Sequence, residues 1–94
     1  MKVILVYDIE TVELADQKRL NKIRKIARKY LYQVQKSVFE GEVTVAQLAR
    51  LERAILEIID KERDSVIIYE LPDGIKWERR ILARKKIDFD SNIL

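Results

Sequence analysis

Cysteine and histidine are both absent from this chain of 94 residues, and glycine and proline are scarce, at two and one. Without cysteine there is no disulfide, and without either residue there is no Ser-His or Cys-His nucleophile pair and no zinc site of the usual kind. Any metal must therefore be held by oxygen ligands, which favour magnesium, calcium or manganese over zinc or copper.

A long apolar run is also missing. The stretch from Met1 to Ile9 is apolar, but it is too short to cross a bilayer and it runs into Glu10. We see no signal peptide, and we expect a cytoplasmic protein with no membrane association. The chain has the length of one domain, with no room for a catalytic domain and a separate substrate domain.

Hydrophobic patterning predicts strands and helices in alternation. Residues 2–9 and 65–71 are rich in Val and Ile and predict strands, while apolar residues recur at helical spacing over residues 15–31. A second helix is expected to begin at the Thr-x-x-Gln capping box of Thr44 and Gln47.

The segment from Tyr32 to Val43 returns to strand-like composition. It contains no two-residue hairpin signal such as Asn-Gly, which favours one long strand with a bulge or kink over a tight pair of strands. Beyond the turn at Pro72, we expect residues 75–82 to form a last short strand.

This order of elements predicts an α+β fold, a ferredoxin-like βαββαβ sandwich with an additional C-terminal strand. We assign residues 1–82 to the ferredoxin-like domain and residues 83–94 to a charged C-terminal tail. The first strand is apolar on both faces, with Ile4 and Val6 on the face opposite Leu5, and two helices cover only one face of a sheet. A homodimer with a twofold axis, in which the uncovered faces meet, is the simplest solution.

The first predicted helix is strongly basic, because no acidic residue lies between Asp16 and Glu40. Lysines at spacings of four, three and four form one stripe on its solvent side, and two arginines lie beside them. These residues are Lys18, Lys22, Lys25 and Lys29, with Arg24 and Arg28. Such a stripe binds a phosphate backbone in a salt-dependent and sequence-tolerant way. The alternative is a solvated helix face, but no acidic residue is present to pair with the stripe, which favours nucleic acid.

Asp8 is expected near the end of the first strand, on the same face as Ile4 and Val6. An aspartate there commonly caps the following turn, and periodicity by itself favours that role. The functional alternative is that two copies of Asp8 share one magnesium ion across a dimer axis. Arg19 falls within the apolar arc of the first helix, from which it would reach toward Asp8 or a bound anion, or else snorkel at the core edge.

Four strings in order carry a resemblance to a known family. They are VYDI (Val6 to Ile9), RLNKIRK (Arg19 to Lys25), VQKSVFEGE (Val34 to Glu42) and DSVIIYEL (Asp64 to Leu71). Together they resemble the CRISPR-associated protein two family, the small partner of the spacer integrase, also described as a CRISPR-associated endoribonuclease. The resemblance runs over nearly the whole chain to about Leu71.

The resemblance implies a ferredoxin-like homodimer whose sheets pack face to face. It also implies that Asp8 binds Mg²⁺ across the dimer axis, with Tyr7, Arg19 and Phe39 near that site. Two activities go with it: metal-dependent endonuclease action on single-stranded RNA or double-stranded DNA, and a structural role in which the dimer bridges the integrase and holds spacer DNA.

Of these two activities, a site with one carboxylate per subunit and no histidine should cleave slowly, so we expect spacer acquisition as the biological role with endonuclease activity beside it. One alternative is a purely structural DNA-binding subunit without catalysis. Another is a toxin-like RNA interferase, which would arrest growth without an integrase partner. A regulatory domain that binds a metabolite has no support from a glycine-rich phosphate loop.

Overall fold

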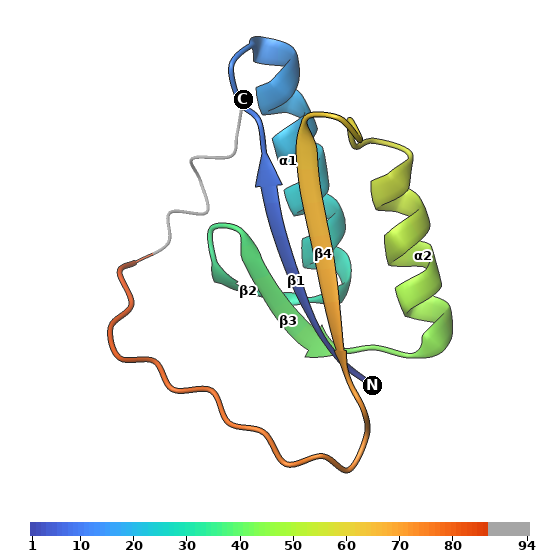
Figure 1. Cartoon of the computed structure of the whole chain (residues 1–94), viewed down its shortest axis with the longest axis vertical. Helices are drawn as coiled ribbons and strands as arrows, with labels where there is room; N and C mark the ends of the chain where they lie inside the picture. Colours follow the sequence, from blue (N-terminus) through green and yellow to red (C-terminus); the bar gives the residue numbers. More distant parts are fainter. Residues whose placement is uncertain (87–94) are drawn as a thin grey trace.

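The computed structural model describes residues 1–86, and residues 87–94 of the expected charged tail lie outside the described residues. The elements are, in chain order, β1 (Lys2–Ile9), α1 (Leu14–Tyr30), β2 (Tyr32–Gln35), β3 (Val38–Glu42), α2 (Val45–Leu56) and β4 (Asp64–Leu71). The four strands form one antiparallel sheet in the order β2-β3-β1-β4, and both helices lie on the same side of it (Figure 1). The predicted ferredoxin-like α+β fold is confirmed. No described helix is long and apolar enough to cross a membrane.

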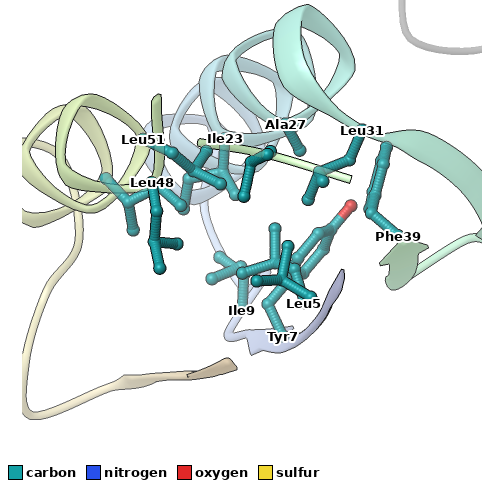
Figure 2. Close-up of a cluster of buried hydrophobic side chains, with 12 residues drawn as sticks. Leu5, Tyr7, Ile9, Ile23, Ala27, Leu31, Phe39, Leu48 and Leu51 are labelled. Atoms are coloured by element: carbon teal, nitrogen blue, oxygen red, sulfur yellow. The ribbon is translucent and has the colours of Figure 1, made fainter. Parts of the chain in front are cut away.

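The strand β1 lies at the centre of the sheet and is hydrogen-bonded to β3 on one side and β4 on the other. Its alternate side chains, including Leu5 and Tyr7, are buried under the helices. Phe39 of β3 pairs with Leu5, and Ile23 of α1 and Leu51 of α2 complete the centre of the core (Figure 2). We call the opposite side, which faces away from the helices, the outer face.

Both helices begin at a reciprocal capping box, which satisfies backbone N–H groups that have no partner within the helix. For α2 the Thr44 hydroxyl accepts a hydrogen bond from the Gln47 backbone at 3.1 Å, and the Gln47 side chain accepts one from the Thr44 backbone at 2.9 Å. This confirms the predicted start of the second helix. For α1 the corresponding pair is Glu13 and Asp16.

The prediction of one long strand from Tyr32 to Val43 is wrong. This segment forms the hairpin of β2 and β3, which turns at Lys36 and Ser37. Asn-Gly signals mark turns that need positive φ, and none of the described non-glycine residues has a positive φ. The turn therefore needs no Asn-Gly, and a register shift between Gln33 and Gln35 takes up the irregularity in the pairing.

The additional C-terminal strand expected over residues 75–82 is not formed within the described chain. After the Pro72 turn the chain leaves the sheet and is held by side chains instead of backbone pairing (Figure 1). The Lys2 ammonium lies 4.2 Å from the centre of the Trp77 ring, and Arg79 pairs with Glu40. Because Lys2 and Glu40 are on the outer face, the segment contacts that face and does not extend a free sheet edge.

Phe39→Ala should lower the free energy of unfolding by about 3 to 5 kcal/mol, because it removes a fully buried ring and leaves a cavity. Urea denaturation at one protein concentration measures the change. Val45→Ala is the control, since Val45 is 71% exposed and its truncation should cost less than about 0.5 kcal/mol. Equal stabilities of the two variants would contradict the core role of Phe39.

Candidate active site

Asp8 is exposed on the outer face, one residue before the end of β1. The β1–β4 register places it opposite Ser65, and the next pairs on the same face are Val6 with Ile67 and Ile4 with Tyr69. The outer face thus has the polar pair of Asp8 and Ser65 at one end of β1, the two apolar pairs in the middle, and the charged residues Lys2 and Glu40 toward the other end. Asp8 takes part in none of the ion pairs among residues 1–86.

A shallow depression surrounds Asp8 and Ser65 at this end of the sheet. Its lining comes from the end of β1 and the beginning of β4 with the loop before it: Asp8, Glu10, Glu62, Arg63, Asp64 and Ser65. Most of the charge in this lining is neutralised by ion pairs with neighbouring residues, and Asp8 is outside those pairs.

Arg19 does not reach Asp8, which corrects the prediction for this residue. Its Nε lies 2.6 Å and its Nη2 2.9 Å from the two carboxylate oxygens of Asp64, and its Nη1 lies 2.9 Å from Asp16. The side chains of Asp64 and Asp16 are almost completely buried, at 0% and 1% exposed. Arg19 is therefore a structural residue that joins α1 to the beginning of β4.

Arg63 extends this ion-pair network toward the end of β1. Its Nη2 lies 2.7 Å from Asp16 and its Nε 2.9 Å from Glu10. The hydrogen bond from Arg63 holds the pKa of Asp16 well below its ordinary value of 3.8, and the hydrogen bond from Arg19 lowers the pKa of Asp64. Both carboxylates thus stay ionised at neutral pH inside the fold.

The side chains of Tyr7 and Phe39 do not lie on the same face of the sheet as Asp8, although the resemblance implied that they are near its site. Both lie on the inner face of the sheet, with ring centres 6.0 Å apart and an angle of 28° between the rings (Figure 2). The Tyr7 hydroxyl donates a hydrogen bond to the Lys36 carbonyl at 2.9 Å, and burial raises the pKa of this hydroxyl. In this chain the two rings are part of the core and brace the β2–β3 hairpin.

The four predicted stripe lysines, Lys18, Lys22, Lys25 and Lys29, are all exposed on the solvent side of α1. Arg24 and Arg28 are half-buried, and Arg28 donates to the Gln33 side chain at 2.8 Å. Because α1 covers the inner face of the sheet (Figure 1), its exposed lysines are separated by the sheet from Asp8, which is on the outer face. The structure does not bring these two predicted sites together.

The ligand types at Asp8 suit a hard cation, because carboxylate and hydroxyl oxygens are the ligands that Mg²⁺ prefers. One chain does not complete such a site. Among residues 1–86 no group of three or more His, Cys, Asp or Glu side chains is arranged to hold a metal ion. The described residues of one chain therefore supply oxygen ligands that suit a hard cation but do not by themselves form a complete site.

Comparison with known proteins identifies the family. The model of the family described as CRISPR associated protein Cas2 matches residues 1–79. This chain belongs to the Cas2 family. The CRISPR-associated endoribonuclease Cas2 2 of Moorella thermoacetica is 50% identical to it over 80 residues, which are 85% of this chain and 88% of the relative. The CRISPR-associated endonuclease Cas2 of Halalkalibacterium halodurans is 36% identical over 95 residues, 100% of this chain and 99% of the relative.

Solved Cas2 structures share the fold. The crystal structure of Streptococcus pyogenes Cas2 at pH 6.5 has a TM-score of 0.71 and 36% identity, and the match covers 79% of this chain and 89% of that one. A second structure, described as the crystal structure of cas2, has a TM-score of 0.70 and 34% identity, with 94% of both chains covered. The ferredoxin-like fold is thus that of known Cas2 proteins.

The sequence analysis did not predict that Ser65 lies opposite Asp8 or that Arg19 pairs with Asp16 and Asp64. Arg19 and Asp64 are 45 residues apart in the chain, and Asp16 and Arg63 are 47 apart, so no local spacing links them. The only signal in the sequence was the polar pair Asp64-Ser65, which precedes the apolar run Val66 to Tyr69. The ion pairs and the position of Ser65 opposite Asp8 became visible only when the structure brought α1, β1 and β4 together.

Asp64→Asn should destabilise the protein by about 3 kcal/mol at neutral pH, because it leaves the buried Arg19 guanidinium without its main partner. Thermal unfolding measures the loss, and Asp73→Asn is the control, since Asp73 is 85% exposed.

Wild type and Asp64→Asn also test how the ion pair depends on pH. A lowered pKa in the folded state means that Asp64 contributes stability above its ordinary value of 3.8, and that this contribution is lost as the pH falls below it. The difference in Tm between wild type and Asp64→Asn should therefore shrink between about pH 6 and about pH 3. A difference that stays constant across this range would contradict the ion pair.

Proposed function

We propose that this Cas2 chain is a metal-dependent endonuclease, of the endoribonuclease type, that acts as a homodimer in CRISPR spacer acquisition in the cytoplasm. The observation that carries the proposal is Asp8, an exposed carboxylate outside the ion pairs, at the end of a sheet face that the helices leave uncovered. The names of the relatives from Moorella thermoacetica and Halalkalibacterium halodurans support a nuclease.

The outer face supports the homodimer. Ile67 and Tyr69 of β4 are 46% and 55% exposed, and they pair with Val6 and Ile4 of β1. Burying such a row of apolar side chains away from water is favourable and would stabilise a dimer. A twofold axis covers this face with a second copy of itself and, when it passes near the polar end, brings two Asp8 carboxylates together.

In this dimer the two Asp8 carboxylates would hold one Mg²⁺ ion. The bound ion would supply a Lewis acid that stabilises negative charge on a phosphodiester oxygen during cleavage. The chain has no histidine to serve as a general base, and Arg19 and Arg63 are held by the ion-pair network. The residues of the chain therefore bind the ion and add little acid–base chemistry, and cleavage should be slow.

The lysine stripe on α1 supports nucleic-acid binding through phosphate contacts, to double-stranded DNA or single-stranded RNA. The dimer would carry the stripe twice and would bridge the spacer integrase while it holds spacer DNA. Because the sheet separates the stripe from Asp8, nucleic acid gripped by the stripe need not reach Asp8. This separation favours, as a second candidate function, a purely structural DNA-binding subunit without catalysis.

Asp8→Asn should abolish magnesium-dependent cleavage of labelled single-stranded RNA and duplex DNA while the protein remains dimeric. The carboxylate is exposed and outside the ion pairs, so its replacement should leave Tm unchanged. Cleavage is followed on gels with and without a chelator, and light scattering gives the oligomeric state. Glu57→Gln, an exposed acid at the end of α2, is the matched control and should cleave like wild type.

Two results would contradict parts of this proposal. Cleavage by Asp8→Asn at the wild-type rate would exclude the carboxylate as a metal ligand. If neither wild type nor variant cleaves while both bind duplex DNA, the structural role is correct and Asp8 is only a polar strand end.

Replacing Lys22 and Lys29 together by alanine should weaken duplex binding at low salt. Removing one phosphate–lysine pair reduces the steepness of log affinity against log salt concentration by about 0.9, so the plot should become flatter. Fluorescence anisotropy over a salt series measures the slope. The control replaces Lys61 and Lys76, two exposed lysines outside α1, and has the same net charge. Equal slopes of log affinity against log salt in both double variants would contradict nucleic-acid binding by the stripe and would mean that it is only a solvated helix face.

A further inference from the structure

Ser65 lies directly opposite Asp8, on the neighbouring strand and on the same outer face. Both residues are exposed and both line the shallow depression at this end of the sheet. Directly opposed residues of an antiparallel pair have their Cβ atoms about 4.5 to 5.5 Å apart. The Ser65 hydroxyl is therefore within reach of the Asp8 carboxylate.

The local fold does not account for this hydroxyl. The turn before β4 is closed by other groups: the Asp60 backbone donates to the Asp64 carboxylate at 2.9 Å, and the Glu62 backbone donates to the Asp60 carboxylate at 3.0 Å. The Asp64 backbone in turn donates to the Asp60 carbonyl at 2.8 Å. Among residues 1–86 the Ser65 hydroxyl makes no hydrogen bond, neither to a group of this turn nor to Asp8.

Packing does not account for Ser65 either. Serine is a weaker strand former than a β-branched or aromatic residue, and the following outer-face positions of β4 are Ile67 and Tyr69. A small polar residue interrupts this apolar row only where the row reaches Asp8. A polar role toward Asp8 explains the interruption.

The backbone beside Ser65 is, in addition, anchored by the contacts of Asp64. Asp64, its neighbour in β4, is clamped by the two hydrogen bonds from Arg19 and pairs with Ile9 in the sheet. The ion-pair network on the inner side thus fixes the backbone from which Ser65 points outward. A serine on a backbone anchored in this way can orient a neighbouring carboxylate by rotation of its side chain alone.

We propose that Ser65 is a positioning residue for Asp8: when a divalent cation binds, the Ser65 hydroxyl rotates to donate a hydrogen bond to one Asp8 carboxylate oxygen and leaves the other oxygen free for the cation. The proposal rests on the proposed function, in which Asp8 is a metal ligand. Hydrogen bonds of this kind orient ligating carboxylates, and their loss typically lowers metal affinity about tenfold or more.

The test compares Ser65→Thr with Ser65→Val, which differ only by a hydroxyl in place of a methyl group and are both suited to an exposed strand. The affinity of the full chain for Mn²⁺, used in place of Mg²⁺, is measured by electron paramagnetic resonance of the free ion. Ser65→Thr should bind like wild type, and Ser65→Val roughly tenfold more weakly. Their Tm values in the presence of a chelator should be equal, which excludes a difference in folding.

Asp8→Asn separates the two levels of the proposal. If this variant loses Mn²⁺ binding while the Thr and Val variants bind equally, the role of Ser65 is wrong and the Asp8 site stands. If Asp8→Asn binds Mn²⁺ as wild type does, Asp8 is not a ligand and both proposals fail. If Asp8→Asn loses Mn²⁺ binding, and Ser65→Val binds Mn²⁺ more weakly than Ser65→Thr, both the Asp8 metal site and the role of Ser65 are supported.

Discussion

The buried ion pair between Arg19 and Asp64 ties together the three segments that meet at one end of the sheet. A carboxylate with no exposed surface is tolerated only when it is paired and hydrogen-bonded, so Asp64 requires Arg19 of α1 and the loop before β4 to be in place. Asp16 and Arg63 extend the same pairing to Glu10, just after β1. The β1–β4 register at this end, and with it the placement of Asp8 opposite Ser65, depends on these contacts.

Alternate side chains of the central strand β1 have different roles, because one set forms the core and the other set lies on the outer face with Asp8. Residues such as Leu5 and Tyr7 point to the helices and form the core, while Ile4, Val6 and Asp8 point to the outer face. The core face is complete within one chain. The outer face is not, because its apolar pairs are partly exposed and its end holds one carboxylate. In the proposed function, a second copy of the chain covers this face and supplies a second carboxylate.

Local signals predicted the elements that local physics determines. Three elements were predicted from residues that are close in the sequence: β1 from its run of Val and Ile, α1 from its helical spacing, and the start of α2 from the capping box at Thr44. The structure confirms all three. The hairpin of β2 and β3 was missed because its turn uses no positive φ and so carries no Asn-Gly signal. The expected strand over residues 75–82 is not formed because this segment is held against the outer face by the side-chain contacts of Trp77 with Lys2 and of Arg79 with Glu40, which patterning does not show.

The candidate site shows the same division. The sequence by itself determined that no cysteine or histidine chemistry exists here, that a carboxylate stands near the end of the first strand, that a row of lysines faces solvent, and that the chain resembles the Cas2 family. Only the tertiary structure decided that Arg19 serves Asp64 and not Asp8, that Tyr7 and Phe39 are core residues, and that Ser65 faces Asp8. The physical reason is that composition and periodicity act within one element, whereas strand register and burial join residues of different elements, such as Arg19 and Asp64, which are 45 positions apart.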